Sequence, residues 1–247
     1  MRSLIVSICM LFLSMNTLQA RDISIAMGSI EPYFISKQDS GIFTDLIRAT
    51  FRKIPELQPS FRFGLTNKVR WNLYEVGKVD AVANIFDSVD ADGCRTDELF
   101  RFSDVAITRK SSNLKLNELV DLSGQTIISF EGARGFFGEK YSKHLSDEKY
   151  FETKVQASQA RMLITKRVDV SVGDLFIFLN ALQDPANVGA SPADFDYHML
   201  FPQISTRMAF KDASLCAPFN KALKEIRDNG EYEEIYDMYL KRYNFTQ

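Results

Sequence analysis

Polar groups that could do chemistry stand at two points where a strand is expected to give way to a helix. Asp174 follows the apolar segment 168–172, where a carboxylate can cap a helix or pair with a cation. The turn 132–134 follows the apolar segment 126–130, and its backbone N–H groups could hold an anion, with Arg134 adding a positive charge. A buried zwitterion needs both kinds of group, because each of its charges must be paired.

The sequence carries none of the common patterns of catalytic or metal-binding machinery. It has no P-loop, no nucleophile elbow and no ordered Ser/His/Asp set. The only histidines, His144 and His198, are isolated, so no Cys/His cluster has the spacing of a zinc site. We therefore expect neither a metal nor a cofactor.

The first twenty residues have the layout of an export signal. Met1-Arg2 gives a basic start, residues 4–13 are almost wholly apolar, and Ala20 stands before the charged Arg21. The apolar stretch is too short for a comfortable membrane span, although an uncleaved anchor is the alternative. We predict cleavage after Ala20 and an exported protein, which is periplasmic in a cell with two membranes.

Charge and hydropathy exclude several classes of partner. The full chain has a formal charge of −2, and loss of Arg2 with the signal takes the mature chain to about −3. No basic run exists, so nucleic acid and anionic membranes are not expected partners. No later segment is apolar enough to span a bilayer.

Two cysteines, Cys94 and Cys216, remain after removal of the signal. In an oxidising compartment they could form a disulfide. Two cysteines do not make a disulfide framework, and a sequence gives no Cα separation, so two free thiols are the alternative.

Alternating strands and helices predict an α/β protein. Removal of 20 residues from 247 leaves 227, which suits two small lobes better than one core. The expected strands are 23–27, 61–65, 79–85, 126–130 and 168–172, with extended segments at 100–108 and 204–210. The expected helices are 43–54, 69–76, 133–145, 158–166 and 175–182, and the tail forms two amphipathic helices separated by Gly230.

Seven short motifs occur in one order along almost the whole mature chain. They are 23–27 with Glu31-Pro32-Tyr33, Gly41 to Ile47, Leu73 to Ala81, Phe102-Ser103-Asp104, Leu122 to Ile127, Arg167 to Asp174, and the helical tail 214–244. Each is weak alone, but in this order they resemble the bacterial extracytoplasmic solute-binding proteins of amino-acid ABC transporters. That group is family 3, with the type II periplasmic binding protein fold.

The resemblance implies two α/β lobes, each a mainly parallel sheet flanked by helices, joined by two hinge crossover strands and closing like a Venus flytrap. Residues 1–20 would be the signal peptide. Lobe I would comprise 21–107 with 206–247, and lobe II would comprise 108–205. Lobe I is then discontinuous, because the tail returns to it.

The resemblance also implies the charged ligand contacts. Asp174 matches the aspartate that binds the ligand ammonium. Arg95 is the best match to the arginine that binds the ligand carboxylate, with Arg101 as a competitor, although Arg95 stands one residue too far from Phe102. In the turn 132–134, alanine and arginine replace the two hydroxyl residues that the family usually has.

The first lobe departs further from the family pattern. The family sandwiches the ligand between two aromatic side chains, and by ungapped spacing those positions are Ile30 and Asn67. Tyr33, Trp71 and Phe86 are the nearest aromatic substitutes.

Asn84 and Asp87 stand where the family has polar groups at a strand end, and Asp87 could meet a second amine. The predicted ligand-binding residues are therefore Tyr33, Asn67, Trp71, Asn84, Asp87, Arg95, Arg134 and Asp174.

The resemblance implies a monomeric binder, not an enzyme. It would capture an amino acid or small organic acid and present it to a membrane transporter permease or receptor. Two alternatives stay open: a dehydratase-like enzyme on the same scaffold, which would form product, and a sensor or partner-binding module that has lost its small ligand. Nothing in the sequence singles out a perturbed carboxylate for proton transfer.

Overall fold

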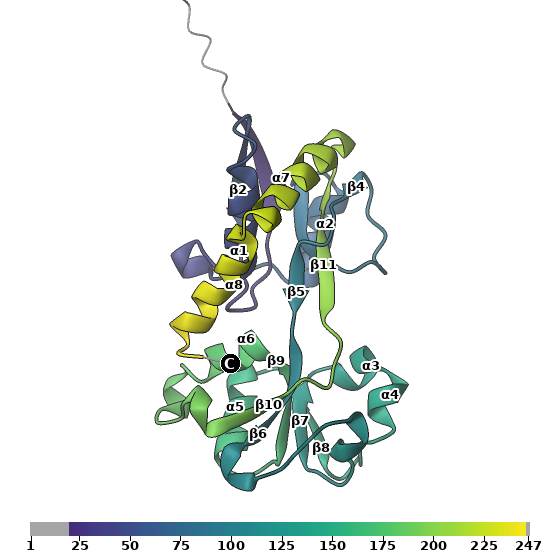
Figure 1. The fold of residues 1–247 in the computed structure, drawn as a ribbon. Coiled ribbons are helices and arrows are strands. Elements are labelled where there is room, and N and C mark those ends of the chain that lie inside the picture. The colour runs from purple at the N-terminus through teal and green to yellow at the C-terminus, as the bar shows by residue number, and fades with distance from the viewer. Residues whose placement is uncertain (1–19, 246–247) are drawn as a thin grey trace, which may run out of the picture.

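The structure is a computed structural model that describes residues 20–245 (Figure 1). The predicted signal peptide lies outside the described residues, apart from Ala20 at its end. None of the helices in residues 20–245 is both long and apolar enough to cross a membrane.

The first sheet has the strand order β2-β1-β3-β11-β4, and β5 pairs with β11. β1 runs parallel to β2 and β3, whereas β11 runs antiparallel to β3, β4 and β5. The strands are β1 (Arg21–Ala26), β2 (Leu57–Arg62), β3 (Ala81–Ile85), β4 (Cys94–Arg95), β5 (Phe100–Phe102) and β11 (Ile204–Phe210).

The second sheet has the order β10-β6-β9-β7-β8. β7 runs parallel to β8 and β9, whereas β6 runs antiparallel to β9 and β10. The strands are β6 (Asp104–Arg109), β7 (Ile127–Phe130), β8 (Tyr150–Thr153), β9 (Val170–Asp174) and β10 (Phe195–His198).

The expected two-lobed α/β architecture is confirmed. In each sheet a single strand, β11 in the first and β6 in the second, runs against all the others, and both strands lie where the chain passes between the lobes. β5 leads through Ser103 into β6, and the return path runs from β10 into β11 (Figure 1). The predicted boundary after residue 107 falls inside β6.

The helices follow the predicted periodicity with one break. They are α1 (Ile42–Phe51), α2 (Asn67–Glu75), α3 (Ala133–Phe137), α4 (Glu139–Ser142), α5 (Gln156–Ile164), α6 (Leu175–Ala181), α7 (Cys216–Asp228) and α8 (Glu231–Arg242). The helix predicted at 133–145 is wrong as a single element, since Gly138 at φ 71° interrupts it. Glycine adopts this left-handed conformation without steric cost.

The tail helices complete the core of the first lobe. Phe219 and Leu223 of α7 and Tyr236 of α8 are buried in one apolar cluster with Phe43 of α1. Burying a side chain of this size contributes about 1.5–3 kcal/mol. Gly230 at φ 87° separates the two helices, as the sequence predicts.

The end of the tail also contacts the second lobe. The Tyr243 hydroxyl donates to Asn180 Oδ1 at 3.0 Å, and the rings of Phe245 and Tyr197 lie 5.0 Å apart. Tyr243 and Phe245 belong to the same buried cluster as Phe178 of α6. The tail therefore ties the two lobes together on one side of the hinge (Figure 1).

Cys94 and Cys216 form a disulfide, which decides the question that the sequence leaves open. Their Cα atoms lie 6.1 Å apart, and the bond joins β4 to the first residue of α7. It closes a chain separation of 122 residues, so it removes much conformational freedom from the unfolded chain.

Removal of the disulfide should destabilise the protein. We expect the double variant Cys94→Ala/Cys216→Ala to lose about 2–4 kcal/mol of unfolding free energy, measured by urea titration. Dithiothreitol should destabilise the wild type by a similar amount and leave the double variant unchanged. Equal stability of the variant and the oxidised wild type would contradict this prediction.

Candidate functional site

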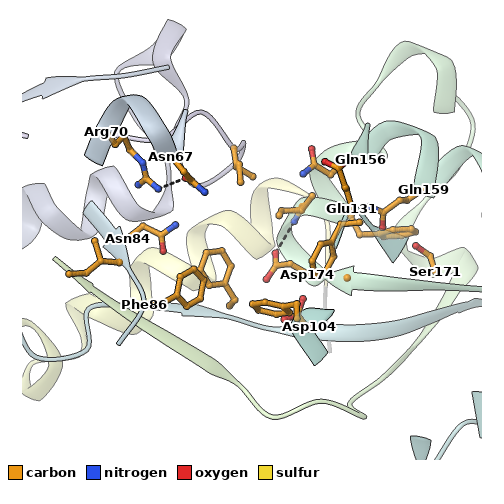
Figure 2. Close-up of a pocket in the computed structure, with 18 of the residues that line it drawn as sticks. Asn67, Arg70, Asn84, Phe86, Asp104, Glu131, Gln156, Gln159, Ser171 and Asp174 are labelled. Atoms are coloured by element: carbon orange, nitrogen blue, oxygen red, sulfur yellow. Dashed lines mark hydrogen bonds between the residues drawn. The ribbon is translucent and has the colours of Figure 1, made fainter. Parts of the chain in front are cut away.

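A cavity of about 430 Å³ lies between the two lobes and is lined from both (Figure 2). Four of the eight predicted site residues line it: Asn67, Trp71, Asn84 and Asp174. Other lining residues are Ile30, Arg70, Phe86, Phe102, Asp104, Phe130, Glu131, Phe136, Gln156, Gln159, Ser171 and Phe178. The volume suits a small organic molecule.

Asp174 is the last residue of β9 and the N-cap of α6. One carboxylate oxygen accepts from the Ile177 backbone N–H at 3.0 Å, and the other accepts from the Ser103 N–H at 2.9 Å. The residue is only 6% exposed. Burial raises the pKa of Asp174 to about 6, although these hydrogen bonds lower it. The helix-capping role and the predicted ligand-binding role are thus compatible, because the same carboxylate caps α6 and lines the cavity.

Asp104 lies directly opposite Asp174 in the antiparallel pair of β6 and β9, so both side chains leave the same face of the sheet. It is 5% exposed and lines the cavity. Within residues 20–245 its carboxylate has no hydrogen bond and no ion pair. Burial, followed by the charge of Asp174, raises the pKa of Asp104 to about 7. A buried carboxylate of this kind stays protonated near neutral pH unless a cation or a hydrogen-bond donor stabilises its ionised form.

Further polar groups of the second lobe surround this acidic pair. The Ser171 hydroxyl is buried and lacks a hydrogen-bond partner among the described residues. Gln159 of α5 is buried, and Gln156 stands one turn before it, both lining the cavity (Figure 2). These side chains can donate to or accept from an occupant.

Arg70 supplies the one cationic side chain among the described lining residues. It projects from α2, whose first turn is capped by the Thr66 hydroxyl. Its guanidinium donates to the Ala83 carbonyl at 2.6 Å and to Asn67 Oδ1 at 2.5 Å. Burial without an acidic partner lowers the pKa of Arg70 to about 10. Two acceptors of the protein itself therefore already bind the Arg70 guanidinium.

Asn84, the next-to-last residue of β3, has the left-handed conformation, at φ 59°. Asparagine tolerates this conformation better than most residues. Its Oδ1 accepts from the Thr206 hydroxyl of β11 at 2.7 Å. The turn that follows brings Phe86 to the cavity.

Aromatic side chains form much of the cavity wall. Phe86 from the first lobe meets Phe136 from the second edge to face, with ring centroids 6.2 Å apart, and Phe136 lies 5.5 Å from Phe130. Ile30 and Asn67 line the cavity without adding a ring. The aromatic surface comes instead from Trp71, Phe86 and the second lobe.

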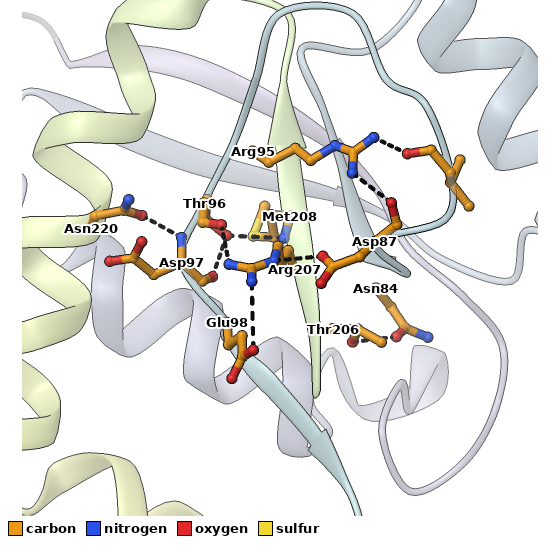
Figure 3. Close-up of polar contacts among 11 residues, drawn as sticks. Asn84, Asp87, Arg95, Thr96, Asp97, Glu98, Thr206, Arg207, Met208 and Asn220 are labelled. Carbon is orange, nitrogen blue, oxygen red and sulfur yellow. Dashed lines mark hydrogen bonds and ion pairs between the residues drawn. The ribbon is translucent and has the colours of Figure 1, made fainter. Parts of the chain in front are cut away.

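Arg95 and Asp87 do not line the cavity. The Arg95 guanidinium donates to the backbone carbonyls of Asp87 and Val89, so it holds the loop after β3 (Figure 3). The Asp87 carboxylate pairs with Arg207 of β11 at 2.7 Å. Carbonyls of this loop thus occupy donors of the Arg95 guanidinium, although Val89 itself lines the cavity.

Arg134 also lies outside the cavity lining, paired with Asp147 at 2.7 Å. The backbone N–H groups of Gly132 and Arg134 donate to the Glu152 carboxylate at 2.7 and 3.0 Å. Burial would raise the pKa of Glu152, but these bonds and one from Tyr150 outweigh it and lower the pKa. The predicted anion-binding turn thus holds a carboxylate of the chain itself.

Tyr33 is buried beside the cavity rather than lining it. Its ring lies 4.1 Å from that of Phe43 and 4.9 Å from that of Phe102, between centroids. It is close enough to Asp174 for that charge to raise its pKa further, beyond the larger effect of burial. Tyr33 therefore lies close to Asp174 without lining the cavity itself.

Sequence reasoning missed Arg70, Asp104 and Gln159 as lining residues. Asp104 stands in the motif Phe102-Ser103-Asp104, which signalled only the crossover. The carboxylate at the end of this motif was the one signal that could have marked Asp104 as a candidate lining residue. Arg70 and Gln159 lie on helices whose facing side chains a sequence does not reveal.

Solved structures of the same fold are found among amino-acid-binding proteins. The second substrate-binding domain of a putative amino-acid ABC transporter from Streptococcus pneumoniae is 20% identical, with a TM-score of 0.68, covering 88% of this chain and 99% of that one. The GluR0 ligand-binding core from Nostoc punctiforme, in complex with L-glutamate, is 17% identical (TM-score 0.62; 88% and 98% covered). The arginine-, lysine- and histidine-binding protein ArtJ from Geobacillus stearothermophilus is 16% identical (TM-score 0.60; 91% and 100% covered).

These likenesses establish the two-lobed periplasmic binding protein fold. No protein-family model matches the chain, and no curated protein matches its sequence.

Replacement of Asp104 should change how stability depends on pH. Its raised pKa means that the native protein keeps a proton that the unfolded chain has released, so wild-type stability falls as pH rises from about 4 to about 7. Asp104→Asn cannot ionise. We expect it to match the wild type near pH 4 and to exceed it by roughly 2–4 kcal/mol at pH 8. Urea unfolding from pH 4 to 8 tests this, and parallel profiles would refute it.

Replacement of Glu152 should free the turn that it holds. We expect Glu152→Gln to cost about 0.5–1 kcal/mol at pH 7, a typical cost for a lost cap at an exposed site. The lowered pKa means that the loss disappears as pH falls through the native pKa. Glu148→Gln, a nearby exposed carboxylate without a described partner, is the matched control. Identical urea midpoints for both variants would argue against the interaction.

Proposed function

We propose that this protein is an extracytoplasmic solute-binding protein. It holds a small molecule between its two lobes and presents it to a membrane transporter permease or receptor. The observation that carries the proposal is a cavity lined from both lobes in which the buried Asp104 carboxylate lacks a partner within the described chain. Solved neighbours of this fold are described as bound to L-glutamate or as binding arginine, lysine and histidine.

Closure of the lobes is the proposed mechanism. The first lobe is built on the sheet of β1–β5 and β11, and the second on the sheet of β6–β10, so the boundaries lie at Ser103 and just before Ile204 rather than at 107 and 205. The hinge consists of the β5–β6 passage and the return from β10 to β11. A ligand that contacts both lobes binds the closed form better, and it shifts the open and closed populations accordingly.

The proposed ligand contacts combine predicted and newly found residues. Four of them are Asn67, Trp71, Asn84 and Asp174, which were predicted from the sequence and line the cavity. Arg70, Asp104 and Gln159 join them. Tyr33, Asp87, Arg95 and Arg134 instead support the surrounding structure, through the contacts that hold their side chains outside the cavity lining.

The proposed location is outside the cytoplasm, after cleavage of the signal peptide behind Ala20. The Cys94–Cys216 disulfide supports an oxidising compartment. We propose a monomer that binds its ligand without converting it, so the molecule should be recovered intact after incubation.

A thermal-shift screen tests the binding function. The panel contains amino acids, amines, dicarboxylates and small phosphorylated compounds, since any ligand of the native state raises the melting temperature. Small-angle scattering should then report a more compact protein with the best compound. A panel without any shift, together with unchanged scattering, would favour the sensor alternative.

Asp174→Asn tests the role of the carboxylate while leaving an oxygen to cap α6. We expect it to lose about 2–4 kcal/mol of binding free energy for the best compound of the screen, because one member of a buried charge pair is removed. Asp184→Asn is the matched control, since Asp184 caps a short helix of the same lobe and does not line the cavity. Calorimetry measures both, and wild-type affinity in Asp174→Asn would place the charge contact elsewhere.

A further inference from the structure

The charges that line the cavity are unbalanced. Asp104, Asp174 and Glu131 contribute three carboxylates, whereas Arg70 contributes the one guanidinium among the described lining residues, a formal sum of 1 − 3 = −2 when all are ionised. Glu131 has an ion pair with Lys154 at 3.2 Å, but the acidic pair has no cationic partner within residues 20–245. A neutral or anionic occupant would leave this pair uncompensated.

The groups that could receive a carboxylate near the acidic pair are already engaged. Glu152 accepts the N–H groups of the turn at Gly132 and Arg134, and loop carbonyls accept the guanidinium of Arg95. Gly132, Arg134, Glu152 and Arg95 all lie outside the cavity lining. At pH 8, above the raised pKa of Asp104, a ligand carboxylate beside Asp104 and Asp174 would therefore meet two like charges and no fixed donor of opposite charge.

Arg70 does not solve this problem for an α-amino acid. Figure 2 shows Arg70 with Asn67 on one side of the cavity, and Asp104 with Asp174 on the other. The ammonium and carboxylate of an α-amino acid are attached to one carbon, so both lie within about 2.5–3 Å of each other. The Arg70 guanidinium is also held by the Ala83 carbonyl and Asn67 Oδ1, so a ligand carboxylate would have to compete with these two acceptors for it.

The remaining wall suits the apolar part of a cationic molecule. Trp71, Phe86, Phe130 and Phe136 line the cavity from both lobes, and the last three are in mutual contact as a chain of edge-to-face rings. Aromatic faces attract cations and cover apolar groups, whereas they offer nothing to a carboxylate.

From these observations we infer that the cavity takes an amine that lacks an α-carboxylate, with its ammonium between Asp104 and Asp174 and an apolar body against the aromatic wall. This inference rests on the proposed solute-binding function and names its ligand class. Gln159 and the Ser171 hydroxyl supply the remaining hydrogen bonds around the ammonium or a second polar group.

The experiment compares each amine with the amino acid from which it differs by one carboxylate. Calorimetry at pH 8 measures phenethylamine against phenylalanine, tryptamine against tryptophan, and cadaverine against lysine, with 5-aminopentanoate as a chain that could reach Arg70. We expect the amine to bind at least 30-fold tighter than its partner in one or more pairs. Asp104→Asn should weaken that amine 10-fold or more, while the control Asp184→Asn leaves it unchanged.

The outcomes separate this inference from the function on which it rests. Tighter binding by any of the three amino acids or by 5-aminopentanoate overturns the amine class and leaves the solute-binding function standing. An Asp104→Asn variant that is folded by circular dichroism and binds the amine normally also overturns it. If none of the seven compounds binds the wild type, the inference of an amine ligand is rejected. If the wider thermal-shift screen also finds no ligand, the proposed solute-binding function is rejected as well.

Discussion

The antiparallel pairing of β6 with β9 is the constraint on which the site depends. It sets Asp104 directly opposite Asp174, at the point where the chain enters the second lobe. The Ser103 N–H then donates to the Asp174 carboxylate, so the crossover strand is fixed to the residue that caps α6. Two buried carboxylates this close cannot both ionise without cost. The pKa of Asp104 is accordingly raised to about 7, and a cation such as the proposed ammonium would favour ionisation of both carboxylates at the entrance to the second lobe.

The turn 132–134 and Arg95, which were predicted to bind a ligand carboxylate, instead bind groups of the chain itself. Glu152 of the edge strand β8 accepts the N–H groups that a ligand carboxylate would need, and Tyr150 supports it through a hydrogen bond of 2.8 Å. The Arg95 guanidinium likewise donates its hydrogen bonds to backbone carbonyls of its own loop. A fold that is also found among amino-acid-binding proteins is thus combined with a cavity whose lining has more carboxylates than cationic groups, and a fold alone does not fix a ligand.

Most elements of the fold could be predicted because their signals are local. The alternation in residues 23–27 and the spacing of Phe43, Leu46 and Ile47 report one strand and one helix, since each period reflects a single buried face. Gly230 ends α7 where the pattern indicates. The break at Gly138 was missed, because a glycine within an apolar pattern is compatible with a continuous helix or a left-handed break.

The sequence by itself determined the α/β class, the order of the two lobes and the place of Asp174 at the start of a helix, because these follow from periodicity and ordered motifs. Only the tertiary structure decided which charges face the cavity. The separation of Asp104 from Asp174 along the chain is 70 residues, and that of Gly132 from Glu152 is 20, so strand register alone brings each pair together. Pairing between distant strands depends on the whole sheet, and for that reason the disulfide, the occupied turn and the acidic pair could not be read from local pattern.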